Sequence, residues 1–267
     1  MIKNRSFYSD FKQKYGPWAV VAGASEGLGA AFAEELARLG VNLVLLARRW
    51  NKLNTLADTL KQKYSIDVLF QSVDLADFDA TQQYLNSLDV EIGLLVYNAA
   101  YAPIDYFKDV ADHELDTLVS VNMRTPLRLI KHLSAKMISN KRGGIVIMSS
   151  MSGLQGSPKI VSYSASKAFL MILAEGLWSE LKPYGIDVVG CCAGAIITPG
   201  YQNAQSGSAP GTLRADQVAH QALLALGNGP IVTPGLMNKI ARFVMGTLLP
   251  KKWAISIMKN NTKNLSR

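Results

Sequence analysis

The sequence predicts a single α/β domain over residues 1–235, with a doubly wound parallel sheet of about seven strands, helices on both faces and a C-terminal helical extension. Short apolar runs alternate with segments of helical periodicity, which is typical of a parallel sheet covered on both sides. The first apolar run leads directly into a glycine-rich loop that opens a helix. No internal repeat and no break in composition indicates a second domain.

Each expected strand is a short, largely apolar run, and each expected helix repeats its apolar residues every three or four positions. The strands are expected at residues 18–22, 41–47, 67–71, 92–97, 145–150, 186–192 and 229–233. The helices are expected at residues 27–39, 53–60, 77–88, 112–139, 158–182 and 215–227. Gly40 follows the first helix, and Pro183 and Gly185 follow the helix 158–182, where such residues commonly end helices.

The composition excludes several classes of protein. With 49% hydrophobic residues in 267, the chain can bury a core and is not disordered. Its polar N-terminal segment lacks the apolar stretch of a secretory signal, and no apolar run approaches the roughly 18 residues of a membrane-spanning helix. The two cysteines are adjacent and the three histidines are scattered, so we expect a cytoplasmic protein with neither disulfides nor a bound metal.

The net charge of +8 is concentrated in the C-terminal part of the chain. Residues 217–267 contain seven basic residues and no acidic one, whereas the first 216 residues contain 21 basic and 20 acidic residues. In the extension, residues 236–267, apolar residues recur at helical spacing up to Pro250, and a second basic piece contains Trp253. Two interpretations stay open: a lid or oligomer-contact helix packed on the domain, or an interfacial helix at a membrane surface. Nucleic acid is not expected as a partner, because the extension has only two aromatic residues and no recognised binding fold.

The loop after the first strand reads GASEGLG and predicts a Rossmann-type dinucleotide site. Gly23 permits a tight turn, while Gly27 and Gly29 let the backbone approach a phosphate and let the helix pack on the sheet. The N-terminus of the helix that follows offers free N–H groups and the positive end of its dipole.

Tyr163 and Lys167 lie four residues apart in the expected helix 158–182, so both would project from one face. A nearby ammonium favours the phenolate and lowers the pKa of tyrosine from its ordinary value of about 10. The spacing therefore predicts a tuned acid–base pair.

Together these motifs resemble the short-chain dehydrogenase/reductase family, and further matches extend along nearly the whole chain. Asn98-Ala99-Ala100 stands where the family has N-A-G, and the segment 192–198 stands where it has P-G and then a threonine. The family's catalytic positions are filled by Asn122, Ser150, Tyr163 and Lys167. Ala100 and Ala193 depart from the usual glycine and proline without removing a reactive group. The N-terminal run FKQKYGPWAVVAGASEGLG is most similar to bacterial hydroxysteroid dehydrogenases of the 7β type, and 3-oxoacyl-CoA reductases are also similar.

The resemblance implies hydride transfer between a nicotinamide cofactor and a ketone or secondary alcohol. Tyr163 would donate or accept the proton, and Lys167 would lower the pKa of Tyr163 and bind the nicotinamide ribose. Ser150 would hold the substrate oxygen. Asn122 would hold a water next to Lys167.

The second expected strand ends at Arg48 and Arg49, where sites that select NAD(H) usually carry an acid for the ribose 2′-hydroxyl. An arginine there suits a 2′-phosphate, so we expect NADP(H), with Arg48 as its main partner and Ser25 and Arg49 assisting. Glu26 in the loop argues against NADP(H), because some relatives that prefer NADPH carry a basic residue at this position. The full set of expected cofactor residues is Gly23, Ser25, Gly27, Leu28, Gly29, Arg48, Arg49, Asp74, Leu75, Asn98, Ala99, Ala100, Tyr163, Lys167, Ile196 and Thr198.

The segment 193–214 is rich in glycine and serine and stands where the family forms its substrate loop. Met151, Leu154, Ile160 and Tyr201 are the expected substrate residues. They are apolar, and no arginine is evidently placed among them to bind a carboxylate. They favour a lipophilic, steroid- or acyl-like ketone or alcohol.

Two other kinds of function fit the residues less well. A catalytically idle NADP(H)-binding regulatory or scaffold protein would not need all four catalytic-type residues. An enoyl reductase or epimerase is less favoured, because the spacing of Ser150 and Tyr163 suits carbonyl chemistry. We expect a homodimer or homotetramer, with its contacts on the helices 112–139 and 158–182.

Overall fold

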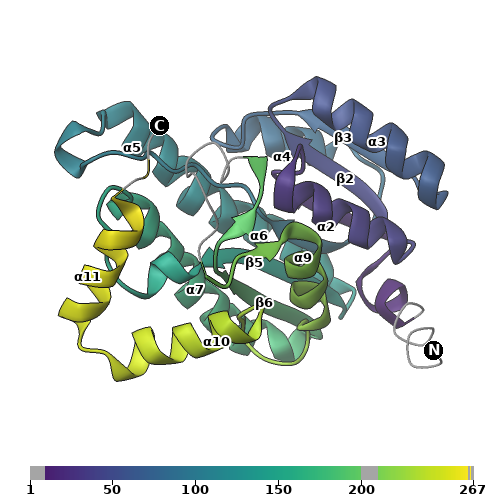
Figure 1. Ribbon diagram of the computed structural model, residues 1–267. Coiled ribbons are helices and arrows are strands. Elements are labelled where there is room, and N and C mark those ends of the chain that lie inside the picture. The colour runs from purple at the N-terminus through teal and green to yellow at the C-terminus, as the bar shows by residue number, and fades with distance from the viewer. Residues whose placement is uncertain (1–9, 200–209, 264, 266–267) are drawn as a thin grey trace.

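The computed structural model describes residues 10–199, 210–263 and 265. Seven parallel strands form one sheet in the order β3-β2-β1-β4-β5-β6-β9, which confirms the predicted fold class (Figure 1). The strands are β1 (Trp18–Ala22), β2 (Asn42–Ala47), β3 (Val68–Ser72), β4 (Ile92–Tyr97), β5 (Gly143–Ser150), β6 (Ile186–Ala193) and β9 (Ile231–Val232). The first three strands of the chain extend the sheet from β1 through β2 to β3. The later strands extend it on the other side of β1, from β4 through β5 and β6 to β9. The order therefore reverses between β1 and β4, and ligands of such folds bind at this point.

Helices cover both faces of the sheet and create two cores. Helices α2 (Gly27–Arg38), α3 (Trp50–Tyr64) and α9 (Ala215–Leu224) contribute to one core, and α4 (Phe78–Asn86), α6 (Thr125–Ser139) and α7 (Val161–Leu181) contribute to the other. Alternate residues of each strand point to opposite faces, so in β1 Ala19 and Val21 join the first core and Val20 and Ala22 the second. Both faces are buried, which explains why the strands are apolar throughout.

Three expected elements differ from the structure in detail. The expected helix 158–182 begins only at Val161, because Lys159 adopts the left-handed conformation with a φ of 64°. The last strand, β9, is shortened to two residues that pair with β6. The expected helix 112–139 is continuous, but a π turn at Ser120–Arg124 separates α5 (Asp112–Val119) from α6.

The C-terminal residues form helix α10 (Leu236–Phe243), a π turn at Val244–Leu248, and helix α11 (Lys251–Thr262) after Pro250. Figure 1 shows α10 and α11 along one margin of the molecule, outside the layers that cover the sheet. In the part of the chain that the structure describes, no helix combines the length and the apolar character that crossing a bilayer requires.

The extension contacts the segment between β5 and α7. The Lys251 ammonium donates to the Leu154 carbonyl at 2.8 Å, and the Lys159 ammonium donates to the carbonyls of Lys263 and Leu265 at 2.9 Å. Two short parallel strands, β7 (Ile196–Ile197) and β8 (Leu213–Arg214), pair at the two ends of the segment 193–214.

Candidate active site

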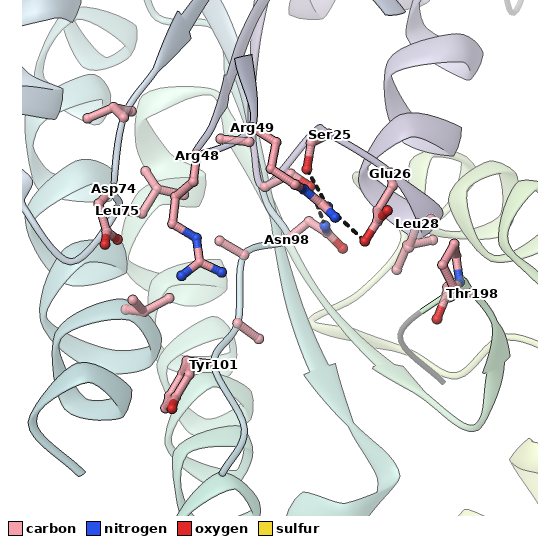
Figure 2. A pocket seen from close by; sticks show the side chains of 18 of the residues that line it. Ser25, Glu26, Leu28, Arg48, Arg49, Asp74, Leu75, Asn98, Tyr101 and Thr198 are labelled. Carbon is pink, nitrogen blue, oxygen red and sulfur yellow. Dashed lines mark hydrogen bonds and ion pairs between the residues drawn. The ribbon is translucent and has the colours of Figure 1, made fainter. Parts of the chain in front are cut away.

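A cavity of about 370 Å³ opens at the carboxyl ends of the strands, where the strand order reverses (Figure 2). The ends of β1, β2 and β4, the segment after β3 and the segment after β7 all contribute to its wall. Twelve of the expected cofactor residues line it: Gly23, Ser25, Gly27, Leu28, Arg48, Arg49, Asp74, Leu75, Asn98, Ala99, Ala100 and Thr198. The other four, Gly29, Tyr163, Lys167 and Ile196, are not among its lining residues.

The glycine loop is packed so closely that side chains are excluded at two positions. Gly23 has a φ of +84°, and a Cβ added there would lie 2.8 Å from the Cα of Ala99. A Cβ on Gly29 would lie 1.9 Å from the carbonyl oxygen of Gly23, so a glycine is needed there for the helix to pack against the loop. The Asn98 side-chain amide donates to the same carbonyl at 3.0 Å and fixes the loop between β1 and β4. The cavity therefore has a preformed backbone wall that fits a dinucleotide phosphate.

The two arginines at the end of β2 have different surroundings. The Arg49 guanidinium donates to Ser25 Oγ at 2.8 Å and pairs with Glu26 Oε1 at 2.7 Å. Figure 2 shows Arg48 extending into the cavity, and among the described residues its guanidinium has no side-chain partner. Arg48 is thus the cation at this end of the cavity that remains available for an anion.

The structure also explains why Glu26 does not oppose an anionic ligand. Arg49 and Lys52 both bind its carboxylate, and their hydrogen bonds hold the pKa of the Glu26 carboxyl below its usual range. The negative charge of Glu26 is therefore compensated locally. Ser25 and Arg49 were expected to help Arg48 bind the 2′-phosphate. In the structure they bind each other, and Arg49 also binds Glu26.

Asn122 is fully buried in the π turn that separates α5 from α6. Its Oδ1 accepts from the Tyr101 N–H at 2.8 Å, and its Nδ2 donates to the Tyr101 carbonyl at 2.8 Å and to Ser166 Oγ at 3.0 Å. The side chain thus ties the segment after β4 to α7. A π turn interrupts the regular helical hydrogen bonds, and such turns are frequent at functional sites. The water that the family resemblance assigned to Asn122 remains a prediction.

Ser150 and Tyr163 meet where β5 ends and α7 begins. Their hydroxyls are hydrogen-bonded to each other. Ser150 Oγ also accepts from the Ser152 N–H at 3.2 Å and from Ser152 Oγ at 3.0 Å. Ser152, which orients the Ser150 hydroxyl, was not predicted; its signal in the sequence is a further serine two residues beyond the strand. The neighbouring Ser149 instead donates to the Lys167 carbonyl at 2.7 Å, so the two adjacent serines have separate tasks.

Lys167 is buried beneath Tyr163. Its ammonium donates to the Met148 carbonyl at 2.7 Å and lies 5.4 Å from the centroid of the Tyr163 ring. Burial lowers the pKa of Lys167 to about 8, because the charged form loses its hydration.

The expected lowering of the Tyr163 pKa by Lys167 is wrong for the arrangement seen in the structure. Burial raises the pKa of the Tyr163 hydroxyl to about 12, and the hydrogen bond with Ser150 offsets only part of this rise. The physical reason is that the ammonium is directed at the Met148 carbonyl and the tyrosine ring, while desolvation disfavours a phenolate. At neutral pH Tyr163 is consequently a protonated phenol, the form that donates a proton.

The expected substrate residues Met151, Leu154 and Ile160 are half-buried in the segment between β5 and α7, and Tyr201 lies outside the described residues. Leu154 also lines a second cavity of about 570 Å³, between β9 and the extension. Arg242 lines that cavity as well. No arginine was expected near the substrate residues, because α10 brings Arg242 there from nearly 90 residues further along the chain.

Comparisons with known proteins agree with this geometry. The pattern of the short chain dehydrogenase family matches residues 17–209. The chain is 39% identical to a very-long-chain 3-oxoacyl-CoA reductase of Aspergillus terreus over 180 residues, which cover 65% of this chain and 51% of the relative.

Two solved structures resemble the whole domain. A structure described under "Structural and biochemical insights into 7beta-hydroxysteroid dehydrogenase stereoselectivity" superposes with a TM-score of 0.87 at 27% identity, covering 93% of this chain and 98% of the other. A short-chain dehydrogenase from Sphingobium yanoikuyae in complex with NADPH has a TM-score of 0.77 at 27% identity, covering 87% of this chain and 96% of the other. The chain therefore belongs to the short-chain dehydrogenase family and is an oxidoreductase acting on CH–OH and keto groups.

Proposed function

We propose that the protein interconverts a ketone and a secondary alcohol on a lipophilic, steroid- or acyl-like substrate, with NADP(H) as cofactor. The observation that carries this proposal is the hydrogen-bonded Ser150–Tyr163 pair above the buried Lys167, at the carboxyl ends of the same sheet that forms the glycine-walled cavity. The relatives named for 7β-hydroxysteroids and very-long-chain 3-oxoacyl-CoA, and the neighbour in complex with NADPH, support the substrate class and the cofactor.

Each residue of the site has its own role in the proposed reaction. NADPH, when bound, supplies the hydride. Ser150 holds the carbonyl oxygen by a hydrogen bond, and Tyr163 donates its hydroxyl proton to that oxygen as negative charge develops on it. Lys167 places a positive charge beneath Tyr163; burial outweighs this charge in the resting phenol, but the charge favours the phenolate as the proton leaves. Asn122 keeps the segment after β4 in place against α7.

We expect the purified protein to consume NADPH with bulky apolar ketones, including a steroid ketone and a 3-oxoacyl-CoA, and to form the secondary alcohol. Absorbance of NADPH and mass spectrometry of the product would measure this. If NADPH binds, as shown by its fluorescence, and yet no ketone is reduced, the idle-protein alternative is correct. Consumption only with enoyl compounds would indicate the enoyl reductase alternative.

The second prediction is a pH dependence of the reduction. Because burial lowers the pKa of Lys167 to about 8, its ammonium loses its proton as the pH rises through that value, whereas Tyr163 stays protonated up to about pH 12. We therefore expect kcat/KM for ketone reduction to fall above about pH 8. In Lys167→Arg the side chain stays charged, so any residual activity should lose this falling limb. A wild-type profile that stays flat well above pH 8 would contradict the assigned role of Lys167.

Two further properties complete the proposal. We propose a homodimer or homotetramer that uses α5–α6 and α7, because these helices expose Val119, Leu127 and Ile172. The adjacent Cys191 and Cys192 are both free and buried, which favours a cytoplasmic location.

A further inference from the structure

Helix α10 turns its apolar side outward. Leu236, Met237, Ile240 and Phe243 are 75%, 58%, 57% and 58% exposed. They recur at three- and four-residue spacing and so form one stripe. A helix on the surface of a globular domain normally buries such a stripe against the core.

Polar contacts hold α10 in this orientation. Asn238 is buried, and its side-chain amide donates to the carbonyls of Pro234 and Gly211 at 2.9 and 3.0 Å. Arg242, four residues on, donates to Thr233 Oγ1 at 3.3 Å. The helix therefore directs its polar side to the domain and leaves its apolar side uncovered by the described residues.

Helix α11 continues the exposed apolar surface and adds positive charge. Ala254 and Thr262 are buried, which defines the side of α11 that packs inward. At 100° per residue, Lys252 and Lys259 lie on the outer side, and Trp253, about 100° around the helix from Lys252, also points away from the buried side. Trp253 is 64% exposed. Indole rings beside lysines are typical of helices that lie at the boundary of a bilayer.

An exposed apolar surface could contact either a second copy of the chain or a lipid bilayer, and the charge of this region favours one of the two. Residues 217–267 carry seven basic residues and no acidic one. In a symmetric contact between two copies, each basic extension would face the other, and like charges brought together in this way repel. An anionic lipid surface offers both the opposite charge and an apolar layer beneath it.

We propose that the outer face of the extension, formed by Leu236, Met237, Ile240, Phe243, Leu248 and Trp253 with the lysines around them, docks the protein on anionic lipid bilayers. This binding goes beyond the proposed reaction and does not depend on it. It would bring the segment 151–160, which contacts α11 through Lys251 and Lys159, close to a membrane.

The test uses the full-length protein and sedimentation with vesicles. One set contains phosphatidylcholine alone, and the other contains equal parts of phosphatidylcholine and phosphatidylglycerol. We expect binding to the second set only, and we expect it to weaken strongly near 1 M salt, where the screening length is about 3 Å. Trp253 emission should shift to the blue on binding, and this component should be missing in Trp253→Phe.

Two sets of substitutions separate charge from apolar contact. Lys239→Gln/Lys252→Gln/Lys259→Gln should weaken binding roughly 100-fold, since each basic residue near such a surface contributes about fivefold. The matched control Lys12→Gln/Lys61→Gln/Lys141→Gln has the same net charge, lies outside the extension and the proposed oligomer contact, and should bind like the wild type. Leu236→Ser/Ile240→Ser should weaken binding at least about tenfold, whereas Tyr184→Ser/Leu224→Ser should not. Thermal melting confirms that each variant is folded.

The proposal is overturned if the wild type binds neither set of vesicles, or if the two lysine triples lose binding equally. It is also overturned if Leu236→Ser/Ile240→Ser converts an oligomer into a monomer without changing vesicle binding. That result would assign the outer face to a second copy of the chain. A chain that binds vesicles and reduces no ketone would leave this inference standing while refuting the proposed function.

Discussion

Replacing Tyr163 with phenylalanine is expected to lower kcat for ketone reduction roughly 10²- to 10⁴-fold, the usual contribution of a general acid. The substitution removes one hydroxyl, which is the group that meets Ser150 and the only proton donor in the proposed assignment for the substrate oxygen. The ring that lies over the Lys167 ammonium is retained. NADPH affinity should therefore stay nearly unchanged, so that the loss appears in kcat.

The measurement is steady-state kinetics with a bulky ketone, combined with NADPH binding by fluorescence. Tyr184→Phe makes the same change at an exposed tyrosine just beyond α7, and its kcat should equal that of the wild type. Ser150→Ala should also lower kcat, because the substrate oxygen loses a hydrogen bond. Turnover close to normal in Tyr163→Phe would remove Tyr163 from its role and, with it, the proposed proton transfer.

Replacing Arg48 with glutamine is expected to raise the KM for NADPH roughly 10- to 100-fold while changing the KM for NADH much less. A hydrogen bond to a charged group is worth about 1.5–3 kcal/mol, and among the described residues the Arg48 guanidinium has no other side-chain partner. Arg48→Glu should go further and reverse the preference, because a carboxylate repels the 2′-phosphate and can bind a 2′-hydroxyl.

Arg49 is the comparison residue for this experiment. Arg49→Gln should change the preference between NADPH and NADH less than Arg48→Gln, since Ser25 and Glu26 already bind the Arg49 guanidinium. The measured quantity is the ratio of kcat/KM for the two cofactors in each variant. If Arg48→Gln leaves this ratio unchanged, or if Arg49→Gln changes it more than Arg48→Gln does, another residue binds the 2′-phosphate.

The features that depend on residues close together in the chain could be predicted from the amino-acid sequence. Apolar runs located the strands, helical periodicity located the helices, and the glycines between β1 and α2 located the cavity wall. The four-residue spacing of Tyr163 and Lys167 placed both on one side of α7. These predictions succeeded because strand burial, helix periodicity and tight turns are local properties of the chain.

The features that depend on contacts between distant residues, or on burial, became visible only in the folded chain. Glu26, in the β1–α2 loop, binds Arg49 beyond the end of β2 and leaves Arg48 available, which periodicity does not reveal. Desolvation, which exists only after folding, raises the pKa of Tyr163, where spacing alone predicted the opposite shift. The outward orientation of the apolar stripe on α10 also depends on contacts between distant residues. An apolar periodicity shows that a helix has two sides, but the buried Asn238 determines which side faces the domain.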